Sequence, residues 1–282
     1  MLCPACTKSF SPIQIFHFPN YKIFTCSWCE IRFCQPFVDN STIYTEQFIK
    51  KESQYFFGTK YLTFEHVKQL KPYLSLKNKR ILDIGCATGN FLNTYTDNNQ
   101  VMGLEISQVY GPLLKEKRIP HKIGDLATNL KALPDSSFDL ITLWDVFEHL
   151  QDPINILKLA KTKLTSEGII VNWTNNYDDW ISRFAEMTYR GTFGGLKAFM
   201  DRSFHRASGH NYNFTPNFLS MLYQKLGLKI VDTIITDTPA HRLTQNIPFR
   251  IILEVFYLLN RFSKKGKIIC SVLTVEAGKN SC

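Results

Sequence analysis

The chain lacks the features that would place it in or across a membrane. No apolar run reaches the roughly 18 residues that a membrane-spanning helix requires, and Cys3 arrives too early for a secretory signal peptide. We therefore expect a cytoplasmic protein whose eight cysteines are mostly reduced thiols or metal ligands. Its 282 residues, 44% of them hydrophobic, are enough for a sizeable core in one or two domains.

Two frequent nucleotide-binding motifs are absent as well. The chain has no Gly-Lys-Ser/Thr, which argues against a triphosphate-binding loop. The dinucleotide pattern G-x-G-x-x-G is not met either, because residues 83–89 read Asp-Ile-Gly-Cys-Ala-Thr-Gly. An aspartate at this position would repel a pyrophosphate, and it suits a cationic ligand.

Long blocks of like charge are also missing. The formal net charge of +9 is compatible with nucleic acid or an anionic membrane surface as a partner. The lysines and arginines are scattered, however, so an ordinary solvated basic surface explains them equally well.

What the chain does contain is a strand followed by a glycine turn. Residues 80–84 form a short apolar run typical of a buried parallel strand. Gly85 and Gly89 then allow a tight turn and a close approach of the backbone to a ligand. We expect Thr88 or Asn90 to cap the helix that follows. An ordinary strand and turn is the alternative.

Two Cys-x-x-Cys pairs stand near the N-terminus, Cys3 with Cys6 and Cys26 with Cys29. Their spacing is typical of a zinc ribbon with four thiolate ligands, a closed and structural kind of site. The segment between the pairs alternates as in small strands. Four buried free cysteines are the alternative. Two neighbouring residues are interpreted as lying outside the ligand set: Cys34 and His17.

The remaining chain alternates strands and helices, as in a doubly wound α/β sheet. The predicted strands after the first are 101–106, 121–126, 138–145, 168–175, 229–237 and 267–275, and the predicted helices are 61–71, 153–164 and 216–226. Glu105 ends the second strand, where an open α/β sheet binds ligands, and can accept both hydrogen bonds of a ribose diol. We predict a Rossmann-like, seven-stranded fold, divided into a ribbon (1–36), a helical connector (37–79) and a main domain (80–282).

The Asp83–Gly89 turn resembles motif I of the class I S-adenosylmethionine-dependent methyltransferases, with Ala87 in place of the usual third glycine. The segment from Asp145 to Pro153 resembles motif IV and its extension in the ubiquinone-type members. The resemblance implies an antiparallel seventh strand and S-adenosylmethionine as cofactor. It implies these cofactor-binding residues: Asp83, Gly85, Cys86, Ala87 and Gly89 for the methionine part, Glu105 and Ile106 near the ribose, Asp125 and Leu126 at the adenine, and Asp145 near the methyl group.

Candidate catalytic residues come from two segments. His149 can act as a general base near neutral pH, or it can make a structural hydrogen bond. The 176–215 stretch is longer than an ordinary connection. By resemblance it forms a lid over the acceptor, with His210 and Tyr212 facing the active site; packing of a helical cap is the alternative.

The C-terminal part has an apolar segment flanked by basic residues, 249–265. As an amphipathic helix it would rest on the inner face of an anionic membrane, or it would pack on the sheet or the lid. We favour packing.

Three functions are compatible with the sequence. The first is a methyltransferase acting on a small-molecule, lipid or glycan-precursor acceptor. The second is an RNA methyltransferase that holds RNA with its ribbon, although residues 1–36 carry only Lys8, Lys22 and Arg32 against Glu30. The third is a non-catalytic binding protein that retains the cofactor fold.

Overall fold

The computed structural model describes residues 1–45, 47, 68, 71, 73, 77–237, 240 and 246–276. The helix predicted at 61–71 and most of the predicted connector lie outside the described residues.

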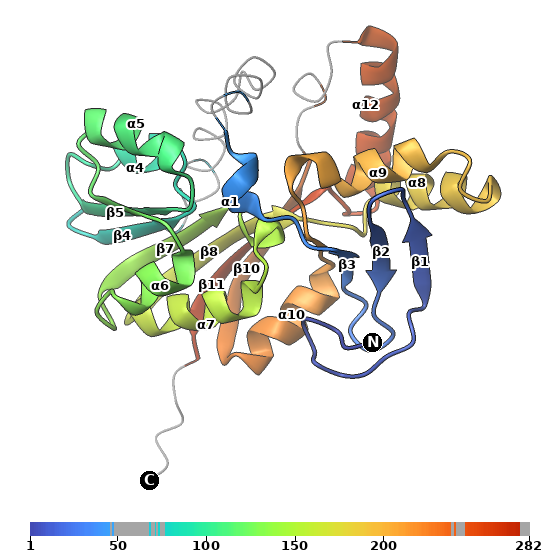
Figure 1. The fold of residues 1–282 in the computed structure, drawn as a ribbon. Coiled ribbons are helices and arrows are strands. Elements are labelled where there is room, and N and C mark those ends of the chain that lie inside the picture. Colours follow the sequence, from blue (N-terminus) through green and yellow to red (C-terminus); the bar gives the residue numbers. More distant parts are fainter. Residues whose placement is uncertain are drawn as a thin grey trace.

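A seven-stranded sheet forms the centre of the molecule (Figure 1). Its strands are β4 (Arg80–Ile84), β5 (Gln100–Glu105), β6 (His121–Ile123), β7 (Phe138–Trp144), β8 (Leu164–Asn175), β10 (Leu228–Thr236) and β11 (Ile268–Val275). They lie in the order β10-β11-β8-β7-β4-β5-β6. β11 is antiparallel to both of its neighbours and the other pairs are parallel. The predicted Rossmann-like, seven-stranded sheet and its antiparallel seventh strand are confirmed.

The direction of strand order reverses at β4, which pairs with β5 on one side and β7 on the other. Both central strands are buried apolar segments, as expected of a sheet covered on two faces. Loops that leave adjacent parallel strands in opposite directions open a crevice at the carboxyl ends of those strands. The fold therefore places a ligand site above β4.

Short helices flank the sheet: α4 (Asn90–Asn93), α5 (Gly111–Glu116), α6 (Leu126–Lys131), α7 (Pro153–Lys163) and α10 (Pro216–Lys225). The capping prediction for α4 is wrong, because Gly89 is the N-cap and adopts a left-handed conformation with φ 69°. The Lys117 ammonium contacts the Thr88 carbonyl and the Asn90 side chain instead. The cap position thus requires a glycine.

The N-terminal ribbon consists of β1 (Gln14–His17), β2 (Lys22–Thr25) and β3 (Arg32–Gln35). A fourth strand, β9 (Tyr212–Asn213), pairs antiparallel with β3 and comes from the long insertion after β8. The ribbon and the main domain therefore share one small sheet, which the division at residue 36 did not anticipate.

The insertion contains α8 (Trp180–Gly191) and α9 (Lys197–Phe204). Both helices lie beside the ribbon in Figure 1, and Met200 and Phe204 pack against Phe16 of β1. A buried ion pair joins the two parts, with Arg32 donating to Glu186 at 2.7 Å. Burial lowers the pKa of the Arg32 guanidinium to about 10. Packing of the insertion against the ribbon is thus a large part of its structural role.

The last helix, α12 (Ile247–Phe262), packs Leu253 and Tyr257 against Ile181 of α8. This agrees with the favoured prediction that the C-terminal helix packs on the insertion. Within the described ranges, no helix is both long enough and apolar enough to cross a membrane.

Candidate functional site

A cavity of about 690 Å³ opens at the carboxyl ends of β4, β5 and β7. Eight of the predicted site residues line it: Gly85, Ala87, Glu105, Ile106, Asp125, Leu126, Asp145 and His149. The short helix α1 (Asn40–Ile43) lies over one side and contributes Asn40 and Ser41. Residues from four separate strand ends and from the N-terminal part thus meet in one cleft.

Glu105 forms the floor of the cleft at the end of β5. Its carboxylate is buried and accepts N–H bonds from Ala87 at 2.8 Å and Ser107 at 2.9 Å. Burial raises the pKa of Glu105, and these N–H bonds favour the charged form. Each carboxylate oxygen has a further lone pair. The residue can therefore accept two hydroxyl groups of a ligand without losing its backbone contacts.

The glycine turn is held tightly between neighbouring loops. Gly85 has φ 75°, and a Cβ there would lie 2.4 Å from Val146 Cγ2. Ala87 adopts φ 46°, a left-handed conformation that costs a non-glycine residue about 1 kcal/mol. Strain kept at a cleft wall is typical of a functional site.

Three predicted cofactor-binding residues are absent from the lining residues: Asp83, Cys86 and Gly89. The Asp83 carboxyl is buried and accepts a 2.6 Å bond from Thr142 Oγ1. Burial raises the pKa of Asp83 to about 7. Cys86 Sγ packs against Gly103, and a Cβ added to Gly103 would lie 2.4 Å from that sulfur. These residues shape the wall from behind, and a direct ligand contact stays a prediction.

Asp125 caps α6 and lines the cleft at the same time. Its Oδ1 accepts from the Thr128 N–H at 2.8 Å and from the Thr128 hydroxyl at 2.6 Å. The hydroxyl bond, followed by the N–H bond, lowers the pKa of Asp125. Leu126 follows as a buried apolar surface on the same wall. An ionised acceptor beside an apolar side chain suits a planar heterocycle with an amino group.

Asp145 and Glu148 stand where β7 ends. Asp145 has φ 51°, a second strained non-glycine residue in this wall. Glu148 is buried and accepts from Thr174 Oγ1 at 2.7 Å. Burial, followed by the nearby Asp145 charge, raises the pKa of Glu148 to about 8. A positive charge near this strand end would favour the ionised form of Glu148.

Three histidines gather beside the cleft, and of these only His149 is among its lining residues. The ring centroids of His149 and His210 are 4.6 Å apart, and those of His205 and His210 are 5.3 Å apart. Burial lowers the pKa of His149 to about 4 and that of His205 to about 3, and it lowers the pKa of His210 as well. All three imidazoles are therefore neutral at pH 7, the form that accepts a proton. Ligand atoms of Glu148, His149 and His210 lie within 4.8 Å of one another, close enough to share a metal ion.

The backbone of His149 is held by side chains from distant parts of the chain. Its carbonyl accepts from Asn40 Nδ2 at 2.6 Å and from Asn211 Nδ2 at 2.9 Å. Asn211 also accepts the Val38 N–H at 2.7 Å through its side chain and the Cys34 N–H at 3.0 Å through its carbonyl. The position of His149 is thereby tied to the ribbon and the segment after it.

Tyr212 differs from its predicted position. It is buried between Phe37 and Phe214, and its hydroxyl donates to the Gln151 carbonyl at 3.0 Å. It is absent from the cavity lining because β9 pairs with β3 and its side chain joins the core. His210, two residues earlier, contacts Asn175 Nδ2 through Nδ1 at 3.1 Å.

Asn40 and Tyr44 were not among the predicted site residues. Both line the cleft, and the Tyr44 hydroxyl lies 3.5 Å from His149 Nδ1. Burial raises the pKa of Tyr44 far above its ordinary value.

Residues 58–233 of the chain match the Methyltransferase domain family. The match covers more than half of the chain and contains every strand end that lines the cleft. The chain belongs to the methyltransferase domain family. Among solved structures, it is similar to a SAM-dependent methyltransferase from Archaeoglobus fulgidus, with a TM-score of 0.58 and 20% identity over 81% of this chain and 99% of that one. This likeness confirms the class I methyltransferase fold.

Curated relatives share only part of their length with this methyltransferase-family chain. It is 27% identical over 127 residues to a tRNA U34 carboxymethyltransferase from Nautilia profundicola, covering 43% of this chain and 42% of that protein. It is 23% identical over 111 residues to the ubiquinone biosynthesis O-methyltransferase of Haemophilus ducreyi, covering 36% of this chain and 47% of that protein. The chain therefore spans less than half of these relatives.

The cleft of this methyltransferase-family protein is acidic. Five carboxyl groups line it, and among the lining residues that the structure describes there is no lysine or arginine: the acids are Asp39, Glu105, Asp125, Asp145 and Asp152. Such a wall disfavours a polyphosphate and favours a ligand that carries positive charge. The residues present thus fit S-adenosylmethionine, whose sulfonium and ammonium groups are cationic.

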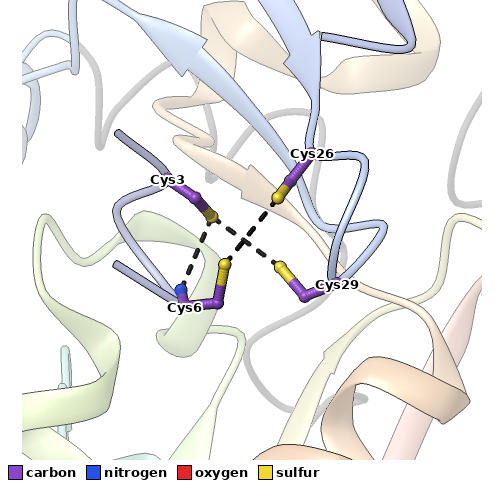
Figure 2. Close-up of side chains that lie close together, drawn as sticks. All are labelled: Cys3, Cys6, Cys26 and Cys29. Carbon is purple, nitrogen blue, oxygen red and sulfur yellow. Dashed lines mark hydrogen bonds between the residues drawn. The ribbon is translucent and has the colours of Figure 1, made fainter. Parts of the chain in front are cut away.

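The ribbon cysteines also fit the metal that their spacing predicts. Figure 2 shows the four sulfur atoms pointing toward one another from two loops. The Cys3–Cys29 sulfurs are 3.7 Å apart and the Cys6–Cys26 sulfurs 3.8 Å. Thiolates bound to one zinc at about 2.3 Å in tetrahedral geometry are about 3.8 Å apart. Cys34 lies outside this group, as predicted, and contacts Arg206.

Proposed function

We propose that this protein is an S-adenosylmethionine-dependent methyltransferase that acts on a small-molecule, lipid or glycan-precursor acceptor. The acidic cleft at the switch point of the sheet carries the proposal, because its five carboxyl groups suit a cationic nucleoside ligand. When bound, S-adenosylmethionine supplies a methyl group that is already activated on sulfur. The chain's own residues then need mainly to position the two reactants.

We assign the roles of the cofactor wall by its geometry. Glu105 accepts the ribose hydroxyls, and Asp125 with Leu126 holds the adenine. The 85–89 turn and Asp145 border the methionine part. Asp83 precedes this turn and Cys86 lies within it, and their buried side chains support it from behind.

On the opposite wall, we assign His149 as the base that takes the proton from the acceptor atom. Its imidazole lines the cleft and is neutral at pH 7, because burial holds its pKa near 4. An imidazole with a low pKa is a weak base, so efficient proton transfer requires that the ring lie close to the acceptor atom. His210 and Tyr212 support this wall, His210 through its ring contact with His149 and Tyr212 by holding the Gln151 carbonyl.

We further propose that Cys3, Cys6, Cys26 and Cys29 bind one structural zinc ion. Their sulfur spacing supports this, as does the donation of the Trp28 N–H to Cys26 Sγ at 3.4 Å. Such N–H contacts orient ligating sulfurs.

The direct test is incubation of the purified protein with labelled S-adenosylmethionine and fractionated cell extracts. We expect label in a small-molecule, lipid or glycan fraction. Calorimetry with S-adenosylhomocysteine runs in parallel, and absence of binding would contradict the cofactor assignment. Binding without transfer to any fraction would instead favour a non-catalytic binding protein.

RNA is the second candidate acceptor, favoured by the relative named as a tRNA U34 carboxymethyltransferase. The ribbon gives it little support, since Arg32 is buried against Glu186 and Lys8 lies over the Trp28 ring at 4.6 Å. Label in the RNA fraction, lost on ribonuclease treatment, would establish this acceptor class in place of the first.

A further inference from the structure

The outward side of α12 is an apolar surface without a described partner. Seven side chains on it are 44–86% exposed: Ile247, Ile251, Ile252, Val255, Leu258, Leu259 and Phe262. We call them the outer face of α12. Five of them recur at spacings of four, four, three and four residues, which aligns them on one side of a helix. The opposite side already packs on α8 through Leu253 and Tyr257.

The exposed apolar side chains of the outer face do not help to hold α12 in place, because the opposite side of the helix already packs on α8. Single exposed apolar residues are ordinary, but a continuous apolar stripe marks a binding surface for a protein or a membrane. The stripe runs the full 16 residues of α12. Figure 1 shows this helix rising beyond the insertion helices, on the same upper side of the molecule as α1, which lines the cleft.

The charges beside the outer face decide between the candidate occupants. Arg250 and Arg261 are exposed along one flank, Lys264 follows the C-terminus, and Glu254 is the one acidic residue of α12. Within the described chain, none of these three basic side chains forms an ion pair. A second copy packed antiparallel on the stripe would bring Arg250 of one chain toward Arg261 of the other. An anionic lipid surface would instead attract all three charges.

We propose that α12 is an interfacial helix that binds the protein to anionic membranes, with its outer face among the acyl chains and its basic flank at the headgroups. The helix lies in the plane of the interface and does not span the bilayer. Basic side chains beside an apolar stripe are the typical arrangement of such helices. This inference concerns binding alone, so it stands or falls independently of the proposed methyl transfer.

The test is flotation of the full chain with vesicles of phosphatidylcholine alone or mixed with phosphatidylglycerol. We expect binding to the anionic vesicles, little binding to the neutral ones, and weakening by salt. The triple variant Val255→Gln, Leu258→Gln and Phe262→Gln should bind at least about tenfold more weakly. The double variant Arg261→Gln and Lys264→Gln should lose roughly fivefold or more for anionic vesicles only.

Met221→Gln is the matched control, because Met221 is 51% exposed on α10, away from α12. It should bind vesicles as the unchanged protein does. All variants should keep their circular dichroism and their affinity for S-adenosylhomocysteine. The proposal is overturned if the protein binds no vesicles, or if the triple variant binds them as well as the unchanged chain. If the protein binds no vesicles, and light scattering shows a dimer that the triple variant abolishes, the outer face is a dimer contact instead.

Discussion

The two walls of the cleft are built in different ways. The wall that we assign to the cofactor comes from short stretches of sequence: the 83–89 turn and single residues at the ends of β5, β6 and β7. The proposed acceptor wall contains Asn40 and His149. The His149 carbonyl is held by Asn40 and Asn211, and Asn211 is in turn bonded to Cys34, so residues far apart in the chain set its position. One wall is therefore specified locally and the other by the whole tertiary structure.

The largest expected effect tests whether the acceptor wall depends on the ribbon. Cys26→Ser should abolish zinc binding and unfold the ribbon, because four-thiolate sites supply much of the folding energy of such modules. Through Cys34 and Val38 the loss should reach Asn211 and His149. We expect methyl transfer to fall at least about a hundredfold while S-adenosylhomocysteine binding changes less than roughly threefold. Metal analysis, calorimetry and turnover measure this.

Cys34→Ser is the control for that variant, since Cys34 lies in the same ribbon but outside the four ligands. It should retain one zinc ion per chain. Equal losses of cofactor binding and turnover in Cys26→Ser would show that the walls are not separable.

His149→Gln should act on the acceptor wall alone. Loss of a general base costs roughly 10²–10⁴ in kcat, while the affinity for S-adenosylhomocysteine should stay unchanged because His149 is not among the residues that we assign to the cofactor. Single-turnover kinetics separates the two. Unchanged kcat would leave His149 as a structural residue that holds the loop between Asn40 and Asn211.

Asp83→Asn tests the buried support of the cofactor wall through pH. Burial raises the pKa of Asp83 to about 7 in the folded chain, against 3.8 ordinarily. Between those values the folded protein keeps a proton that the unfolded chain releases, so stability falls as pH rises from 4 to 7, by at most about 1.4 kcal/mol per unit. The variant lacks this titration. The difference in free energy of unfolding between the variant and the unchanged protein should therefore shift in favour of the variant by roughly 2–4 kcal/mol over that range, and then stay constant.

Urea denaturation at a series of pH values measures the difference. The exposed Asp97→Asn controls for the removal of charge. A difference between Asp83→Asn and the unchanged chain that does not vary with pH would contradict the buried, protonated state.

Glu105→Gln tests the wall that we assign to the cofactor. The amide keeps the shape but loses the charged acceptor, and hydrogen bonds to charged groups are worth about 1.5–3 kcal/mol. S-adenosylhomocysteine should therefore bind roughly tenfold to a hundredfold more weakly. Calorimetry that finds unchanged affinity would remove Glu105 from the cofactor site.

The smallest effect is expected at Ala87. Glycine relieves the left-handed strain at φ 46° but costs more entropy on folding, so Ala87→Gly should stabilise the chain by about 0.5–1 kcal/mol. Thermal unfolding measures this, and a lower melting temperature would show that the methyl group packs usefully.

The sequence predicted the cofactor wall because its signals are local. Short apolar runs located the buried strands, and acidic residues at strand ends located the cleft, including Glu105. The pairing of β3 with β9 was missed because a strand of two residues leaves no period to detect. Tyr212 was expected to face the cleft for the same reason, since its burial depends on a partner in the distant ribbon. The capping prediction for α4 failed because Gly89 takes the N-cap position, and the Asn90 side chain contacts Lys117.

The β3–β9 pairing also sets an order of events during synthesis. Phe33 pairs with Tyr212, so its partner leaves the ribosome 179 residues later (212 − 33). At about 5–20 residues per second, that interval is on the order of ten to forty seconds. The ribbon cysteines emerge together early and can gather a metal ion at once, whereas the edge of β3 must wait. A nascent chain would therefore hold a finished metal module beside an open strand edge until the second half of the protein arrives to close it.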